Sequence, residues 1–596
     1  MNNLAKSNIF FANLLYIIRL VVISLILFNF NKAFAEEALD PEPFEIWGES
    51  TDLIIPQLEN SNLEEDIIED GALDSESNNA LEGIVRSDFS YSIDDTLGLY
   101  DESNGGFSSN IWKSSNFKDI NYLIINLPKK IDNKKLLDLK LISLLTIATP
   151  PKDMDQSDTN FLQVKIDHFK SIGDYNSIIS ISELIDDEEF DQDLIENIIN
   201  FHLLKGNYKA ICHKDILNKI ISESISLKIR AFCNAMSNNL PAIDLIISLI
   251  VEEEIYDKDL VYILNAYLNE IDIDINKIQN FDLFKLNLIN NKGIDFSKNI
   301  SKDSEIELQL FYINSKASSD IKKITLTESL VSRGIVGSET LANVYKKYLI
   351  DNRIEVDADP NDSTSDLVKR ALLYNQVRQT SNQADLLTLA SAYVVNMGNA
   401  NLLNNSASLI YDKVKIITPK QEYKDHSLSV CLLLLLNDDF EQCQKWLTNL
   451  DFIKDAEEIR ARIKFYLSLR DGTSNFNEED INLLLNDSKI SVNHKNVLAK
   501  YSELRYELEL LEYWKSENEF NKISTQVSNI KLAQYLKNIS KENKGEIILL
   551  ISIIHGNNPT STLDQHTLFL ILESLNRLDP VYLDDFIFEY FANNQI

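Results

Sequence analysis

Apolar residues recur at intervals of three to four positions from about residue 112 to the end of this 596-residue chain. Leu162, Ile166 and Phe169 form one such stripe. A short polar turn, Gly173-Asp174-Tyr175, follows it, and a second stripe begins at Ile178. This spacing places apolar side chains on one face of a helix. The pattern therefore predicts a helix, a turn and a second helix.

The same unit is repeated further along the chain. Two more turns, Gly206-Asn207-Tyr208 and Asn238-Asn239-Leu240, begin 33 and then 32 residues further on. A small residue follows each turn, at Ser177, Ala210 and Ala242. A helical hairpin of ~34 residues with a small residue and an aromatic near the turn resembles the tetratricopeptide repeat, in which each hairpin buries its apolar face on the next. We therefore expect an all-α fold, a tetratricopeptide-like α-solenoid.

Two features divide the expected array. Asp351–Asp366 is polar and contains Pro360, so it predicts a loop or hinge between two helical lobes. Leu563–Arg577 and Pro580–Ala592 predict two closing helices that cap the array, because a proline is favoured in the first turn of a helix. The expected lobes span residues 111–350 and 367–596.

The composition favours helices over sheets. Only 15 glycines and 11 prolines occur in the chain, less than half of the usual share of each. Ligand-binding loops of sheet enzymes usually need glycine, whereas helices joined by short polar turns do not. The hydrophobic share of 44% is sufficient for an extended core.

Negative charge is concentrated near the N-terminus. The net charge of the chain is −35, and residues 36–110 contain 21 acidic residues against a single basic one, Arg86. Such a surface repels nucleic acid and anionic lipid, because unmatched carboxylates add to a repulsive field. We therefore expect no nucleic-acid partner.

Residues 36–110 are predicted to be largely extended or disordered, since their polar composition does not support a packed core. One interpretation is a solvated linker. The alternative is an acidic-hydrophobic motif that docks on a basic partner, with the isoleucine pairs Ile54-Ile55 and Ile67-Ile68 as anchors.

The first 35 residues have the features of a secretory signal. Lys6 and Arg19 give a basic start, Leu20–Phe30 is apolar, and Ala33 and Ala35 are small residues at the positions that a signal peptidase recognises. The alternative is a retained anchor, but the apolar run falls short of the ~20 residues that span a bilayer. We expect cleavage after Ala35, a periplasmic or secreted bacterial protein, and no stable membrane insertion afterwards. No lipid-modified cysteine is expected behind the leader.

The four cysteines are expected to form two disulfides. Cys212 and Cys233 lie at equal distances from the polar break Ser222-Glu223. Cys431 and Cys443 are likewise centred on a predicted turn at Asn437. Residues at equal distances from a turn lie side by side in an antiparallel hairpin, and an exported protein folds in an oxidising space. The alternative is four buried free thiols.

No pattern of catalytic or metal-binding residues stands out. The chain lacks zinc-ligand spacing, phosphate-binding glycine loops and the serine-hydrolase elbow. His202, Cys212 and His213 could converge across a hairpin, but the position of His202 in an apolar stripe favours a core histidine. Glu573-Ser574 superficially resembles the motif of soluble lytic transglycosylases, yet no lysozyme-like domain follows it, so we expect Glu573 to face solvent on a closing helix. No catalytic, cofactor-binding or metal-ligating residue is assigned.

Residues 97–151 resemble the start of a family of uncharacterised secreted helical proteins of Alphaproteobacteria. The similarity lies in Leu97–Asp101, Gly105-Gly106-Phe107 and Ile111-Trp112-Lys113, with Thr149-Pro150-Pro151 at the end and Pro43–Gly48 upstream. This resemblance implies an exported α-helical repeat protein and brings no catalytic residues with it.

These features together predict a binding protein rather than an enzyme. Stacked hairpins form a long surface that suits a protein or peptide partner, as in an envelope adaptor or scaffold. The acidic body would favour a basic partner, and self-association is a further option. The alternatives are a structural envelope spacer without a dedicated ligand, or a periplasmic enzyme of unrecognised type.

Overall fold

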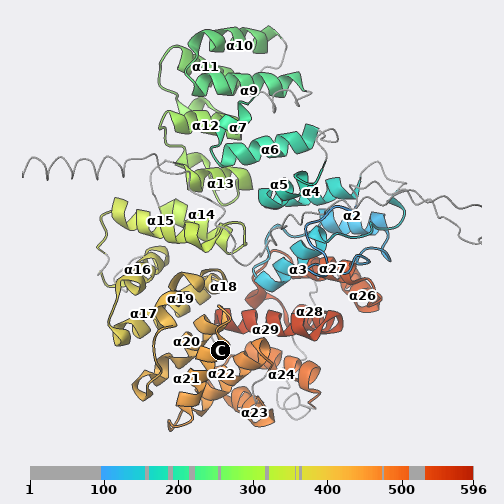
Figure 1. Cartoon of the computed structure of the whole chain (residues 1–596), viewed down its shortest axis with the longest axis vertical. Coiled ribbons are helices and arrows are strands. Elements are labelled where there is room, and N and C mark those ends of the chain that lie inside the picture. The colour runs from blue at the N-terminus through green and yellow to red at the C-terminus, as the bar shows by residue number, and fades with distance from the viewer. Residues whose placement is uncertain are drawn as a thin grey trace, which may run out of the picture. The chain divides into compact units, whose positions relative to one another are not determined.

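The computed structural model of the chain describes most residues from Thr96 onwards (Figure 1). The described ranges are 96–154, 160–185, 192–213, 222–252, 257–315, 321–355, 358–360, 365–472, 476–508 and 530–594. The predicted signal sequence with Ala33 and Ala35, and the acidic segment up to residue 95, lie outside the described residues.

The fold is all-α, as the sequence predicts. The described residues contain no β-strand, only isolated bridges between Tyr100 and Thr146 and between Asn116 and Lys152. The helices of the first half are α2 (Phe117–Ile125), α3 (Lys134–Leu145), α4 (Phe161–Ile172), α5 (Tyr175–Ser182), α6 (Gln192–Leu204), α7 (Tyr208–Ile211), α9 (Glu223–Met236), α10 (Leu240–Glu252), α11 (Lys258–Leu268), α12 (Leu283–Asn291), α13 (Ile306–Asn314), α14 (Ile321–Val331) and α15 (Ser338–Asp351). Those of the second half are α16 (Asp366–Gln379), α17 (Gln383–Asn399), α18 (Leu403–Ser406), α19 (Ser408–Val414), α20 (Ser427–Leu435), α21 (Phe440–Leu450), α22 (Glu457–Arg470), α23 (Glu478–Asn486), α24 (Val492–Tyr506), α26 (Ile530–Asn538), α27 (Lys544–His555), α28 (Gln565–Leu578) and α29 (Pro580–Asn594).

The predicted turns are where the helices end and begin. Gly173 ends α4 with φ of 78°, a left-handed conformation that glycine adopts without strain. The next residue, Asp174, caps α5, because its carboxylate accepts a hydrogen bond from the Ser177 N–H at 3.1 Å. Gly206 and Asn207 repeat this arrangement between α6 and α7. The sequence signal thus consists of a helix stop followed at once by a helix start.

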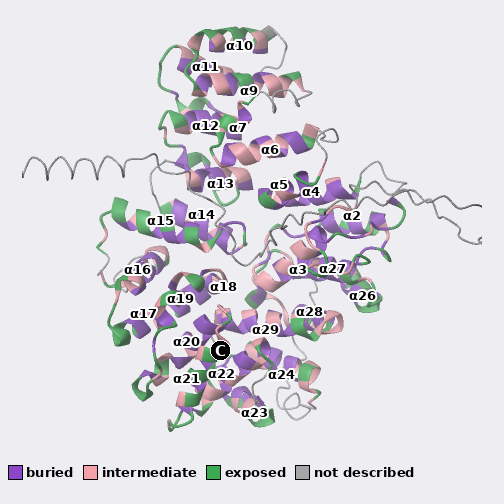
Figure 2. Cartoon of the chain, viewed as in Figure 1, coloured by how far each residue is buried: buried purple, intermediate pink, exposed green. Residues whose placement is uncertain are grey.

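Most helices pack against their neighbours in the chain. The pairs α9 and α10, α14 and α15, α16 and α17, α20 and α21, and α27 and α28 all lie in contact. Figure 2 shows that buried positions follow the faces along which helices meet, whereas the outward faces are exposed. The apolar stripes read from the sequence therefore form the core between successive helices.

The packed structure begins earlier than residue 111, where the helical region was expected to start. The carbonyl of Leu97 accepts a hydrogen bond from the buried Lys165 Nζ at 2.6 Å. The N–H of Leu99 donates to the Leu145 carbonyl at 2.6 Å. The Phe107 ring packs edge-on against Tyr582, with 6.2 Å between ring centroids. Residues 96–110 thus lie along the helices rather than in the extended acidic segment.

The first and last helices are packed together. Helix α3 contacts α27 and α29, and α2 contacts α27 (Figure 1). In a simple solenoid each repeat contacts only its neighbours in sequence. The expectation that the last two helices cap an open end does not match this arrangement, because α29 also contacts α17, α22 and α28 and buries residues on several sides.

Helices on either side of the predicted hinge are in direct contact. Helix α15 ends at Asp351 and α16 begins at Asp366, and both α14 and α15 pack against α16. A buried ion pair crosses this junction, since Arg370 of α16 donates two hydrogen bonds to Glu328 of α14, at 2.9 and 2.6 Å. The Tyr345 hydroxyl of α15 donates to the same carboxylate at 2.6 Å.

Candidate functional site

A group of titratable side chains from distant parts of the chain lies where its first and last helices meet. We call this region the seam. It comprises the loop 127–133, the start of α3, the loop 555–561 and the helices α27 and α29. Residues more than 400 positions apart in the sequence form hydrogen bonds here.

Asp132 is the centre of one network in the seam. Its carboxylate accepts hydrogen bonds from the Thr560 N–H at 3.0 Å and from the Thr560 hydroxyl at 2.6 Å. His555 Nε2 lies 2.9 Å from the Thr560 hydroxyl oxygen and 3.4 Å from Asp132. Burial alone would raise the pKa of Asp132, but the hydrogen bonds from His555 and Thr560 lower it overall.

An acid, a histidine and a hydroxyl are also the residue types of a catalytic triad. In a triad, however, the acid and the hydroxyl bond to opposite ring nitrogens. Here Asp132 and Thr560 both lie at Nε2 of His555, while Nδ1 lies 3.1 Å from the Gly556 carbonyl. His555 and Thr560 are also buried. This geometry holds the two ends of the chain together and does not form a proton relay to an exposed nucleophile.

A second network joins α3 to α29. The N–H of Lys135 donates to both carboxylate oxygens of Glu589, at 3.1 and 3.0 Å. The Lys135 ammonium forms an ion pair with Asp585 at 2.7 Å. The pKa of Glu589 is raised to about 8, mainly by burial. The Lys135 N–H and the Lys134 charge oppose this rise, whereas Asp138 and Asp585 add to it. At neutral pH this carboxyl therefore retains its proton to a large extent.

The cavity in the seam is small. It has a volume of about 10 Å³ and is lined by Asp132, Asn133, Asn401, Thr560, Ser561, Glu589, Tyr590, Asn593 and Asn594. A volume of ~10 to 15 Å³ holds one water molecule. This cavity can therefore hold a water among polar groups, but not an organic substrate.

Glu589 makes the stability of the seam dependent on pH. A carboxyl titrates near pH 4.3 in an unfolded chain, so its raised pKa makes the folded state bind more protons between about pH 4.5 and 8. Stability should fall as pH rises through this window. Glu589→Gln should lose less of its free energy of unfolding than wild type between pH 5 and 8, as measured by urea unfolding. The two slopes should differ by a fraction of ~1.4 kcal/mol per pH unit, the contribution of one fully released proton. Glu542→Gln, at an exposed position before α27, is the control, and equal slopes in both variants would contradict this assignment.

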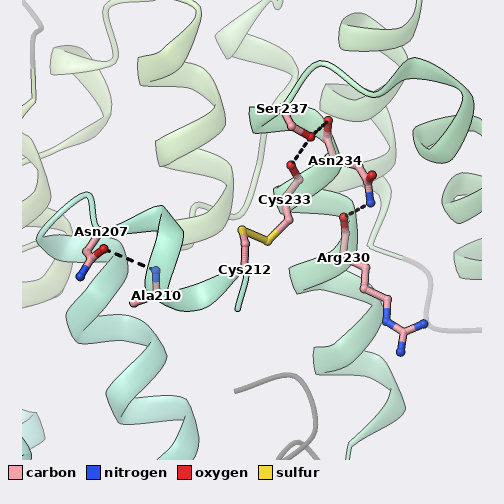
Figure 3. Close-up of a disulfide and its surroundings, with 7 residues drawn as sticks. All are labelled: Asn207, Ala210, Cys212, Arg230, Cys233, Asn234 and Ser237. Atoms are coloured by element: carbon pink, nitrogen blue, oxygen red, sulfur yellow. Dashed lines mark hydrogen bonds between the residues drawn. A yellow bond between two sulfur atoms is a disulfide. The ribbon is translucent and has the colours of Figure 1, made fainter. Parts of the chain in front are cut away.

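The first predicted disulfide is present. Cys212, just after α7, is bonded to Cys233 of α9, with 5.7 Å between their Cα atoms (Figure 3). Ser222, at the predicted break between the two, is the N-cap of α9. Because Cys212 has no free thiol in this bond, Cys212 cannot serve as a metal ligand with His202 and His213.

Loss of this disulfide should destabilise the α6–α10 region. The bond closes a loop of 21 residues, for which chain-entropy arguments give about 3 kcal/mol. In Cys212→Ser/Cys233→Ser we expect an earlier urea transition, and dithiothreitol should shift wild type to the same midpoint. Cys431→Ser serves as a control for reduction, because its response to dithiothreitol should equal that of wild type. An unchanged wild-type midpoint on reduction would contradict a stabilising role.

The second predicted disulfide is not present, because Cys431 and Cys443 are buried free thiols. Cys431 lies on α20 and Cys443 on α21, as the hairpin geometry requires, but the Cys431 Sγ points at the Cys443 carbonyl, 3.6 Å away. Burial raises the pKa of Cys431, and a neutral thiol does not attack a disulfide. Cys431 and Cys443 are therefore close in space, as their equal spacing from the turn predicts, but they are not bonded.

The remaining candidates occupy structural positions. Glu573 is exposed on α28 and pairs with Lys500 at 2.7 Å, while the Ser574 hydroxyl donates to the Leu570 carbonyl. His202 is half-buried in α6, and burial lowers its pKa. Across the described residues, no group of three or more His, Cys, Asp or Glu side chains could hold a metal ion.

Sequence reasoning did not identify the seam. Asp132, His555 and Thr560 belong to no motif, and their spacing carries no periodic signal. They become neighbours only because α3 packs against α27 and α29.

The chain was compared with family models, with curated proteins and with solved structures, and none of the three comparisons found a match. No helix among the described residues is both long enough and apolar enough to cross a membrane. The Cys212–Cys233 bond is typical of proteins that fold in an oxidising environment.

Proposed function

We propose that this protein is an exported α-helical scaffold that binds a protein or peptide partner along the faces of its stacked hairpins. The observation that carries the proposal is the run of helices from α4 to α24, each packed on its neighbours and presenting outward faces to solvent. Such surfaces suit extended or helical segments of a partner. The disulfide supports an oxidising compartment, in keeping with export.

Charge indicates the kind of partner. With a net charge of −35, the chain would accelerate association with a basic segment and disfavour acidic competitors. Exposed ion pairs are screened by salt, with a Debye length of ~10 Å at 0.1 M. Binding of a basic partner should therefore weaken as ionic strength rises.

The test is a crosslinking pull-down from envelope fractions, followed by binding measurements with the purified partner. Two versions are compared, the chain from residue 36 and the chain from residue 96. The boundary lies at 96 because residues 97–107 pack against the helices. A partner that both versions bind, with affinity falling between 50 and 500 mM salt, supports recognition by the helices. Loss of binding on truncation would place recognition in the acidic segment, and salt-independent binding would contradict the electrostatic part.

A further inference from the structure

A group of positive side chains interrupts this acidic protein close to the seam. We call Lys129, Lys130, Lys302 and Arg333 the basic cluster. Arg333, in the turn after α14, donates from Nη2 to the Lys129 carbonyl at 3.3 Å. Burial lowers the pKa of Lys130, and repulsion from Arg333 and Lys302 lowers it further, against the attraction of Asp132. Arg333 and Lys302 therefore lie close enough to Lys130 to repel it, and Lys129 is its neighbour in the chain.

A buried lysine and a buried histidine lie close to the cluster, and burial keeps the histidine neutral. Lys140 of α3 and His168 of α4 are 1% and 6% exposed. Burial lowers the pKa of Lys140 to about 7, with Asp174 opposing and Arg333 adding to the shift. Burial likewise lowers the pKa of Arg333 to about 10. Within the described part of the chain, His168 Nε2 and Arg333 Nε have no hydrogen-bond partner.

The acids that act on these cations are already engaged. Asp132 accepts hydrogen bonds from Thr560. Asp174 caps α5 by accepting from the N–H and the hydroxyl of Ser177, at 3.1 and 2.6 Å. Two cations, Arg333 and Lys302, act on Lys130 against the single acid Asp132. Like charges in excess of their counter-charges destabilise a fold, particularly where they are partly desolvated. The cluster is therefore suited to a ligand with several carboxylates.

The start of the described chain lies near this cluster, at the other end of α3. Leu137 of α3 adjoins the Arg333-Gly334 turn, since a Cβ built on Gly334 would lie 3.0 Å from its Cδ2 atom. Eight residues further along α3, the Leu145 carbonyl accepts the N–H of Leu99. At 1.5 Å per helical residue the two points are ~12 Å apart. About four extended residues span this distance.

The residues that come before Thr96 have the complementary charge. Positions 46–95 contain 14 acidic residues and Arg86 as the single basic one, with Asp94 and Asp95 at the end. We propose that this acidic segment docks on the basic cluster of its own chain, with carboxylates near its end pairing with Lys129, Lys130 and Arg333. The contact does not depend on the external partner proposed above, although a basic partner would compete for the same segment.

Zero-length carbodiimide crosslinking of the chain from residue 36, followed by mass spectrometry, tests this proposal. The reagent joins only carboxyls and amines that are in contact. At 20 mM salt we expect crosslinks between acids of the segment and Lys129, Lys130 or Lys302, at least fivefold more frequent than links to other exposed lysines. In 500 mM salt they should fall to the background level, because the pairing is electrostatic. Mixing isotopically labelled and unlabelled chains separates links within one chain from links between copies.

A charge variant and a matched control complete the test. In Lys129→Ser/Lys130→Ser/Arg333→Gln, links from the segment to the remaining Lys302 should fall at least fivefold. Lys415→Ser/Lys537→Ser/Lys541→Ser removes the same charge from exposed positions elsewhere and should retain them. The salt series on wild type decides the matter if the first variant does not fold. Links spread evenly over all exposed lysines, links insensitive to salt, or links mainly between copies would each overturn the proposal.

Discussion

Arg370→Ala should lower the free energy of unfolding by about 3 to 5 kcal/mol. Arg370 and Glu328 form a bidentate ion pair, and their side chains are only 10% and 9% exposed. Removal of the guanidinium leaves the Glu328 carboxylate buried, with a hydrogen bond from the Tyr345 hydroxyl still in place. The cost is therefore mainly that of an uncompensated buried charge. Urea unfolding, monitored by circular dichroism at pH 7, measures it.

Arg378→Ala is the matched control. Arg378 lies two turns further along α16 and pairs with Asp412, but the two side chains are 36% and 53% exposed. Exposed ion pairs contribute ~0 to 1 kcal/mol, so this variant should remain close to wild type. In Arg370→Leu/Glu328→Leu, where both charges are removed, most of the stability should return. Equal effects of Arg370→Ala and Arg378→Ala would show that the buried pair does not fix α14 to α16.

Trp112→Ala should cost about 3 to 5 kcal/mol by opening a cavity between the first and last helices. The Trp112 side chain is completely buried and packs edge-on against Phe161, with 5.9 Å between ring centroids. It also lies against Gly545 in the first turn of α27, where a Cβ would come within 2.4 Å of the indole ring. The indole thus fills the space that the missing side chain of Gly545 leaves.

Gly545→Ala tests the same contact from the other side. Alanine at a helical position normally stabilises by up to ~1 kcal/mol relative to glycine. Here the methyl group would clash with Trp112, so a loss of about 1 to 3 kcal/mol is expected instead. In Trp112→Ala/Gly545→Ala the methyl enters the cavity, and the combined loss should be smaller than the sum of the single losses. Additive losses would mean that the indole and Gly545 are not in contact. Phe452→Ala, at a side chain that is 76% exposed, should have little effect.

The packing of residues 96–110 on α3, α4 and α29 determines where the chain can be shortened without loss of stability. Removal of all residues up to 110 would eliminate the edge-on contact of Phe107 with Tyr582. It would also remove the Leu97 carbonyl, which accepts a hydrogen bond from Lys165. Such a variant would expose buried surface at the seam. A loss of binding could then not be distinguished from a loss of stability. A chain that begins at Thr96 retains these contacts.

The sequence by itself determined the local structure. The stripe from Leu162 to Phe169, followed by Gly173 and Asp174, indicated a helix, its stop and the next helix start, because these signals act within a few residues. The turn at Ser222 likewise brought Cys212 and Cys233 close enough to bond. For Cys431 and Cys443 the same argument gave proximity but not bonding, since side-chain rotamers and burial decide where each sulfur points.

Only the tertiary structure decided what joins the ends of the chain. Asp132 and Thr560 are 428 positions apart, and no periodicity relates them. Their contact depends on the accumulated angles between all the helices that lie between, so a small change at each junction would separate them. The same holds for the basic cluster, where residues from three separate turns combine their charges. Helices form from neighbouring residues, whereas the seam and the basic cluster form from the packing of the whole array.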